Sequence, residues 1–347
     1  MMTLEKIALL AKVSRSTVSR VINDDPNVSE KTRKRVKKVI EEINFQPNLA
    51  ARRLAGGRTR MIGLMVPMGV SALFTDPFFP LIIQGVSAAS AALNYSVMLW
   101  LAEPEYERRT VRQMLNNHCI DGAVIASMLI DDPLLKAISE DNLPFVLIGR
   151  HPSDTEVSYV DVDNQKAAFE MVEHLVQAGY RRIATITGPH NMIGGYDRLE
   201  GYKAALCRYN LPVNESLIKE ADFTEQGGYN AMYQLIDEKP EAVFVASDTM
   251  AVGAMHAVTE AGLRIPEDIG IAGFDDMPFA ATTNPPLTTM RQPIQQSGAV
   301  AAQTLIDMLD HPSAARHHII LPTELVIRSS CASPEVKNVY NKEGKIL

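Results

Sequence analysis

The chain has few cysteines and no long apolar run. Its three cysteines, Cys119, Cys207 and Cys331, lie far apart among 347 residues, so neither a disulfide framework nor a CxxC metal or redox site is expected. No apolar stretch reaches the ~18 residues of a membrane span, and the pattern of a signal peptide is absent. We therefore expect a protein of a reducing, cytoplasmic environment.

The common catalytic motifs are also missing. The sequence contains no GxGxxG, P-loop, HExxH or GxSxG pattern. His311, His317 and His318 have no third ligand at a useful spacing, so no metal is expected. The nearest catalytic alternative is a sugar-acting α/β enzyme that uses Asp248 or Asp275. We expect instead a protein that is not an enzyme and needs no cofactor.

Charge is distributed unevenly along the chain. The overall composition, 46% hydrophobic and 22% charged residues, is typical of a globular protein, and the length suits two or three domains. Residues 1–60 hold 14 of the 34 Lys and Arg but only 6 of the 41 Asp and Glu, a balance of +8 that leaves −15 for the rest. A basic head indicates a polyanionic partner, and an acidic body confines nonspecific binding to that head.

Three short helices are predicted in the first 46 residues. Apolar residues recur at i, i+3, i+4 and i+7 from Leu4 to Ala11, which indicates one buried helical face after an N-cap at Thr3. Ser14 is a suitable N-cap for a second helix, and Val13 with Val18 forms a hydrophobic staple. A third helix, capped by Ser29, is expected to leave its Lys and Arg side chains exposed and to bury Val36, Val39, Ile40 and Ile43.

The second helix has one apolar face and one hydrogen-bonding face. At 100° per residue, Val18 and Val21 fall opposite Ser16 and Arg20. An ordinary helical bundle with a solvated charged face is the alternative, but spacing, cap, staple and charge sign together favour a helix-turn-helix module that reads the major groove. The residues predicted to contact DNA here are Ser14, Arg15, Ser16, Thr17, Ser19, Arg20, Asn23, Lys31 and Arg33.

The segment "NFQPNLAARRLAGGRTR" predicts a helix of barely two turns. Pro47 ends the preceding helix, Asn48 can cap the short one, and Gly56 with Gly57 stops it. So short a helix is not stable alone in water, so we expect a conditional element. A plain linker is the alternative.

The body alternates apolar strands with amphipathic helices, which predicts parallel α/β sheets. Its strand candidates are "MIGLMVP", "SVMLWLA", "GAVIAS", "FVLIGR", "RIATITG", "AVFVAS" and "IGIAGFDD", and the run at 161–164 resembles a crossing point between two sheets. Ligands bind beyond the carboxyl ends of such strands. The residues found there are the "TDPFF" segment, Arg150, Arg198, Phe223, Asp248, Asp275 and Gln292.

Each of these residues also has a purely structural interpretation. Phe78 and Phe79 can be core residues, Arg150 and Asp275 can form an ion pair, and Asp248 can cap the helix that begins "TMAVGAM". Together, however, guanidinium groups, carboxylates and aromatic rings provide what is needed to grip hydroxyls while stacking on the apolar face of a sugar.

Several ordered motifs make the sequence resemble the LacI/GalR family of bacterial transcriptional regulators. These are "VSRSTVSRVIN", "VSEKTRKRV", "PNLAARRLAGG", "VEHLVQAGYRRIATITG", "ASDTMAVGAM", "IPEDIGIAGFDD" and "PPLTTMRQP", which extend over nearly the whole chain. The resemblance implies an N-terminal all-α helix-turn-helix DNA-binding domain and an α/β periplasmic-binding-protein-like domain of two parallel-sheet subdomains.

The resemblance also implies roles for individual residues. The short segment corresponds to the family's hinge helix, with Leu54 as a minor-groove wedge and Ala51 allowing close approach; Asn48 and Arg52 complete the predicted contacts. Ser247 stands where sugar-binding members often carry Asn, which leaves the identity of any sugar open. The implied ligand-binding residues are Asp76, Phe78, Phe79, Arg150, Arg198, Phe223, Ser247, Asp248, Asp275 and Gln292.

The predicted organisation is a helix-turn-helix domain at 1–46, a hinge helix and linker at 47–60, a ligand-binding and dimerisation domain at 61–330, and a polar tail at 331–347. The tail lacks apolar heptads, so we expect a homodimer on a pseudo-palindromic double-stranded operator. A sugar inducer is favoured as effector, and a purine-type co-repressor is the alternative. A transport binding protein would share the body but would need export and no basic head.

Overall fold

The computed structural model describes residues 4–22, 25–43, 45, 58–66, 73, 76–101, 119–126, 129–130, 135, 138, 142–151, 156–312 and 315–331. Several predicted features lie outside these residues. They are the cap at Thr3, the DNA contact of Asn23, and the hinge segment with Asn48, Ala51, Arg52 and Leu54.

The N-terminal head is formed by three helices, as the sequence predicts. They are α1 (Leu4–Ala11), α2 (Arg15–Ile22) and α3 (Glu30–Glu42). Ser14 caps α2 by accepting the N–H of Thr17 at 3.1 Å, and Ser29 caps α3. The buried apolar side chains among the described residues of the head are Ile7, Ala8, Ala11, Val18, Val21 and Val36. Within α3 only Val36 is fully buried, because a head this small leaves Val39, Ile40 and Ile43 at the edge of its core.

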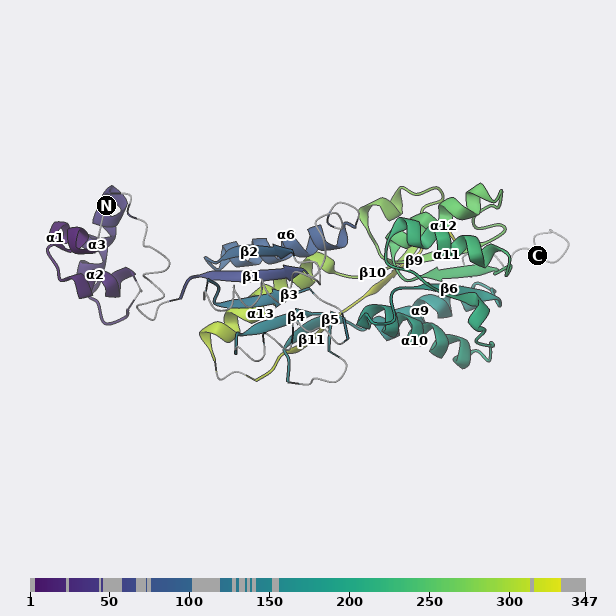
Figure 1. Ribbon diagram of the computed structural model, residues 1–347, viewed down its shortest axis with the longest axis horizontal. Helices are drawn as coiled ribbons and strands as arrows, with labels where there is room; N and C mark the ends of the chain where they lie inside the picture. Colours follow the sequence, from purple (N-terminus) through teal and green to yellow (C-terminus); the bar gives the residue numbers. More distant parts are fainter. Residues whose placement is uncertain are drawn as a thin grey trace.

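The body consists of two α/β units (Figure 1), which confirms the predicted fold class. The first has a parallel six-stranded sheet in the order β11-β5-β4-β3-β1-β2. Its strands are β1 (Met61–Val66), β2 (Ser96–Leu101), β3 (Gly122–Ile125), β4 (Phe145–Ile148), β5 (Tyr159–Val162) and β11 (His318–Leu321). Helices α6 (Phe78–Ala92) and α13 (Ile294–Asp310) pack against each other and bury apolar residues with this sheet.

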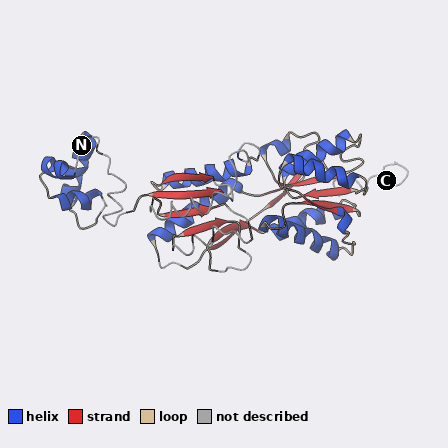
Figure 2. Cartoon of the chain, viewed as in Figure 1, coloured by secondary structure: helices blue, strands red, loops and turns tan. Residues whose placement is uncertain are grey.

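The second unit has a six-stranded sheet in the order β12-β10-β9-β8-β6-β7, parallel apart from the antiparallel pair β10 and β12. Its strands are β6 (Ile183–Thr187), β7 (Ile218–Glu220), β8 (Ala242–Val245), β9 (Gly270–Asp275), β10 (Thr288–Arg291) and β12 (Glu324–Val326). Helices α9 (Asn164–Gln177) and α10 (Ile193–Arg208) cover one face, and α11 (Glu225–Ile236) and α12 (Asp248–Glu260) cover the other (Figures 1 and 2). Two short 3-10 turns are η1 (Glu215–Leu217) and η2 (Pro278–Ala281).

The described chain passes between the two units at three places. The first follows β5 and leads into α9, which confirms the crossing point predicted at 161–164. The others lie between β10 and α13 and between β11 and β12, and neither was predicted from the sequence. Because the units are interleaved in this way, each carries strands that are distant in sequence.

The last described residues pack against the second unit of the body. Cys331, the first residue of the predicted tail, is 3% exposed and belongs to the apolar cluster of the second unit. Ser330 beside it is fully buried and donates its hydroxyl to the carbonyl of Ile271 at 2.6 Å. These contacts hold Ser330 and Cys331 against the second unit, and residues 332–347 of the predicted tail lie outside the described residues. None of the described helices combines the length and apolar character of a membrane span.

Candidate functional site

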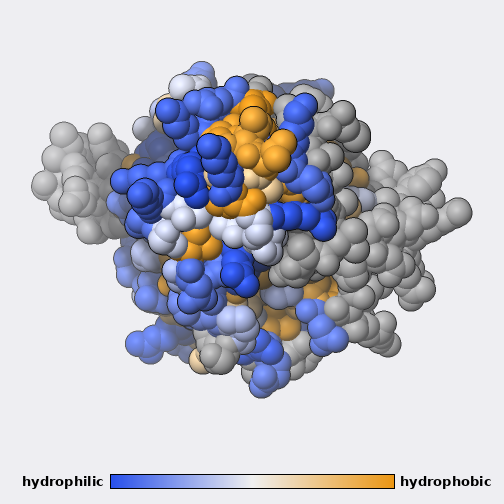
Figure 3. Space-filling model, turned by 90° about the vertical axis from the view of Figure 1, so that its left-hand side faces the viewer, coloured by the Kyte–Doolittle hydropathy of each residue, from blue (hydrophilic) through white to orange (hydrophobic). Residues whose placement is uncertain are grey.

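The exposed face of α2 carries the hydrogen-bonding side chains that the sequence predicts. Ser16 and Arg20 are exposed while Val18 and Val21 are buried against the other two helices. Arg20 lies 3.8 Å from Asp25 in an exposed ion pair, which a stronger anion can replace at little cost. The end of the molecule at which the head lies presents a largely hydrophilic surface that is interrupted by apolar areas, one of them near the top of the view (Figure 3).

Arg33 differs from the expectation that the basic side chains of α3 stay exposed. Its side chain is only 15% exposed, because Nη2 donates to the carbonyl of Asp25 at 2.6 Å. The guanidinium therefore holds the loop between α2 and α3. Arg15 is exposed and pairs with Glu5 at 2.9 Å, and Lys31 is exposed. Their predicted contacts with DNA remain predictions.

A cleft of about 1110 Å³, part of it open to solvent, lies between the two units of the body. It is lined by the ends of β4, β5 and β9 and by residues of α6, α10 and α13. The structure brings eight of the ten predicted ligand-binding residues together in this lining: Asp76, Phe78, Phe79, Arg198, Phe223, Ser247, Asp275 and Gln292. The carboxyl ends of two parallel sheets thus face one another across a single cavity, as the topology requires.

Arg198 is the central cation of the cleft. Its Nε donates to Asn164 Oδ1 at 2.9 Å and its Nη1 to the carbonyl of Ala246 at 2.5 Å. The guanidinium carbon lies 3.7 Å from the ring centroid of Phe274, a cation–π geometry, and Nη1 faces Asp275 Oδ1 at 3.7 Å. With so many partners the guanidinium has one well-defined position from which to bind a ligand.

Asp275 is a buried carboxylate at the end of β9. Its backbone has a φ of 121°, a conformation that turns the chain sharply there. Gln292 donates to Asp275 Oδ1 at 2.5 Å. Burial raises the pKa of Asp275 to about 7, and the charge of Arg198 opposes this shift. Asp275 can therefore accept hydrogen bonds from ligand hydroxyls when ionised and donate one when protonated.

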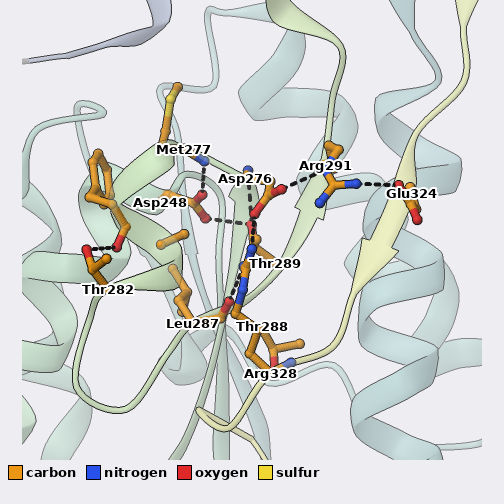
Figure 4. Close-up of polar contacts among 12 residues, drawn as sticks. Asp248, Asp276, Met277, Thr282, Leu287, Thr288, Thr289, Arg291, Glu324 and Arg328 are labelled. Atoms are coloured by element: carbon orange, nitrogen blue, oxygen red, sulfur yellow. Dashed lines mark hydrogen bonds and ion pairs between the residues drawn. The ribbon is translucent and has the colours of Figure 1, made fainter.

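Asp248 lies outside the described lining of the cleft, and its predicted contact with a ligand remains a prediction. Asp248 is fully buried outside the cleft lining, where Met277 N donates to Oδ2 at 2.8 Å and the Thr289 hydroxyl to Oδ1 at 2.6 Å (Figure 4). Burial, then the charge of Asp275, raises its pKa. The helix cap proposed for Asp248 belongs to Ser247, whose Oγ accepts the N–H of Met250 at 3.2 Å. Asp248 instead ties α12 to β10 beneath the site.

Arg150 is also absent from the described lining of the cleft, and the ion pair with Asp275 considered above is wrong. Arg150 Nη2 donates to both carboxylate oxygens of Asp197, at 2.6 and 2.7 Å. Arg150 follows β4 of the first unit and Asp197 lies on α10 of the second. This pair therefore connects the two units beside the cleft.

Aromatic rings close the opposite side of the cleft. Phe78 and Phe79 at the start of α6 pack edge to face, with centroids 5.2 Å apart. Phe79 is 7% exposed and Phe78 is half-buried, so both also serve the core, as one interpretation of the sequence proposed. Asp76 accepts the N–H of Phe78 at 3.0 Å, and burial raises its pKa.

Sequence reasoning missed five polar residues of the described lining: Asp161, Asn164, Asp222, Thr224 and Ser297. Asp161 lies on β5, which was not among the strand candidates, and it is 7% exposed. Asn164 begins α9 and accepts from Arg198. The alternation of "YVDVDN" could have marked a short strand, but only the tertiary structure places Asp161 beside the guanidinium groups.

Comparisons with known proteins agree with this architecture. Residues 3–48 match the model for bacterial regulatory proteins of the lacI family, and residues 172–331 match that for a periplasmic binding protein-like domain. The HTH-type transcriptional regulator CelR of Thermobifida fusca is 37% identical over 332 residues, which cover 94% of this chain and 98% of that protein.

Two solved structures extend the similarity to three dimensions. A complex of the transcriptional regulator CelR with cellobiose has a TM-score of 0.76 at 35% identity, covering 95% of this chain and 100% of the other. The lac repressor dimer bound to operator and the anti-inducer ONPF has a TM-score of 0.80 at 29% identity, covering 95% and 98%.

Proposed function

Because the chain belongs to the lacI family of bacterial regulatory proteins, we propose that it is a transcriptional repressor whose binding to operator DNA is controlled by a sugar held in the cleft. The observation that carries this proposal is the combination, in one chain, of a helix-turn-helix head and a cleft between two units. The cleft offers a carboxylate, a guanidinium and aromatic rings in the arrangement that suits a sugar. The head supplies the DNA-binding surface.

The coupling between cleft and head follows from the position of the cleft. A ligand that contacts Phe79 of the first unit and Arg198 of the second stabilises one relative orientation of the two units. It shifts the operator-binding equilibrium only by its difference in affinity between the two orientations. The Arg150–Asp197 ion pair between the units is a contact that such a change would rearrange.

We propose that the protein acts as a homodimer in the cytoplasm and that the sugar is an inducer. Two heads related by a two-fold axis match a pseudo-palindromic operator. The hinge prediction, with Leu54 inserted in the minor groove, belongs to the same proposal. The relatives are regulators rather than enzymes, so the bound sugar is expected to leave the cleft unchanged.

Thermal unfolding against a panel of uncharged sugars, sugar phosphates and nucleobases tests the effector. A sugar at ~100-fold over its Kd adds about 2.7 kcal/mol and raises the midpoint by a few degrees. The same sugar should release labelled operator DNA, and Asp275→Ala should lose both effects. A nucleobase that shifts the midpoint instead would support the purine-type co-repressor. Recovery of a chemically altered sugar would identify an enzyme.

The role of α2 is tested by a pair of substitutions that remove the same charge. Arg20→Ala is expected to relax the preference at one base pair by about 1–3 kcal/mol, because Arg20 lies on the exposed face of α2. Lys37→Ala on α3 should weaken binding to all sequences alike, and both variants should reduce the salt dependence by a similar amount. Selection of operators from a random pool provides the measurement. Unchanged base preferences in Arg20→Ala would exclude the proposed groove contact.

A further inference from the structure

The cleft has an excess of negative charge. Among its described lining residues are four carboxylates and one guanidinium, and neither Lys nor His occurs there. The carboxylates are those of Asp76, Asp161, Asp222 and Asp275, and the guanidinium is that of Arg198. No described group of acidic, His and Cys side chains is arranged to hold a metal ion that could offset this excess.

The one lining cation is already engaged. Arg198 faces Asp275 and donates two further hydrogen bonds to protein acceptors. The nearby Arg150 has Asp197 as its own carboxylate. Asp222 is exposed, so water screens its charge. Two buried or nearly buried carboxylates, Asp76 and Asp161, thus face the cavity without an ion pair among the described contacts.

Asp161 has a free acceptor atom. Its Oδ1 accepts the N–H of Val162 at 2.8 Å and the Asn164 side-chain amide at 3.2 Å. Its Oδ2 is buried and has no hydrogen-bond partner in the described structure. Burial raises the pKa of Asp161 to about 6, so the group is ionised at pH 8. A buried carboxylate oxygen without a donor is costly, and a ligand hydroxyl would satisfy it.

We propose that the cleft selects an uncharged, hydroxyl-bearing ligand over its phosphorylated or carboxylated counterparts, and that Asp161 Oδ2 accepts a hydrogen bond from a hydroxyl of that ligand. This inference rests on the proposed function, since it assumes that the cleft holds the effector. An anion bound near Asp161 and Asp76 would be repelled by both and would find Arg198 neutralised by Asp275. One unit charge ~6 Å from another at an effective dielectric constant of ~20 corresponds to about 100-fold in affinity.

The experiment compares matched ligands on the full-length protein at pH 8. Cellobiose, ribose and glucose are each titrated beside their phosphorylated forms. Asp161→Asn is nearly isosteric and keeps an oxygen for Val162 N–H and Asn164. Asp163→Asn is the control, because it removes the same charge two residues away at an exposed helix cap that Asn also serves.

The uncharged sugar that binds is expected to do so at least ~100-fold more tightly than its phosphorylated form. Asp161→Asn should weaken binding of that sugar by about 10-fold and reduce the preference for it over its phosphorylated form. Asp163→Asn should change neither the affinity nor the preference. Equal or tighter binding of a phosphorylated sugar, or identical behaviour of the two variants, would overturn the inference and leave the proposed function intact. If the proposed function is wrong, no sugar of the panel binds the protein or changes its binding to operator DNA.

Discussion

Arg198→Met is expected to abolish the response to sugar and to lower the free energy of unfolding of the body by about 3–5 kcal/mol. Arg198 is 7% exposed, and its removal leaves the buried carboxylate of Asp275 without a cation. The acceptors on Asn164 and Ala246 lose their donor as well. Urea unfolding and sugar titration of the full-length protein give the two readouts.

The matched control for this change lies on the same helix. Arg208→Met removes the same side chain from the exposed end of α10 and should alter stability by less than ~0.5 kcal/mol. If Arg198→Met and Arg208→Met lower the free energy of unfolding equally, the contacts of Arg198 in the cleft do not stabilise the body.

The loss in Arg198→Met should be smaller at pH 5.5 than at pH 8. Burial already raises the pKa of Asp275 to about 7, and removing the opposing charge of Arg198 raises it further. A carboxyl whose pKa is higher in the folded than in the unfolded state destabilises the fold as pH rises, because the unfolded chain releases the proton more readily. Protonation of Asp275 at low pH therefore removes the unpaired negative charge and reduces the loss of stability. A deficit that is independent of pH would argue against an unpaired carboxylate as its cause.

Ile7→Asp is expected to lower affinity for operator DNA by at least ~100-fold while the sugar still binds. Ile7 is fully buried in the core of the head, where six of the described residues are buried. Burying a carboxylate there costs several kcal/mol, which is more than so small a core provides. Far-UV circular dichroism, DNA binding by fluorescence anisotropy and sugar titration distinguish unfolding of the head from damage to the body.

Leu9→Asp provides the comparison for this prediction. Leu9 lies on the same helix as Ile7 and is 78% exposed. Leu9→Asp therefore also replaces an aliphatic side chain by Asp, but the new charge stays in water. It should leave the head folded and weaken DNA binding only by the effect of one added negative charge. Equal affinity of the two variants for DNA would contradict the head as the DNA-binding unit. Loss of sugar binding in Ile7→Asp would contradict the division into head and body.

The head could be predicted from the sequence in detail because its signals are local. Caps such as Ser14 and Ser29 and the 3.6-residue periodicity act within a few positions of each other. Arg33 is the exception, since its orientation depends on a carbonyl eight residues earlier in the chain, at Asp25. The apolar periodicity of α3 gives no indication of that hydrogen bond.

The body was predicted well where its strands are long and apolar and poorly where they are short. All seven strand candidates are strands, including β1 and β9. The short strands β7, β10 and β12 and the edge strand β11 were missed, because brief runs with polar residues form strands only when a neighbouring sheet edge is available to pair with them. Asp161 was missed for the same reason, since β5 was read as a crossing.

The sequence by itself determined the family, the helical head, the α/β class of the body and eight of the residues that line the cleft, because motifs and apolar patterns are properties of neighbouring positions. Only the tertiary structure decided how the charges are paired. Arg150 lies with Asp197, Asp275 with Arg198, and Asp248 beneath the cleft. Coulombic interaction and burial depend on distances between strand ends that two interleaved sheets bring together, and no spacing along the chain encodes those distances.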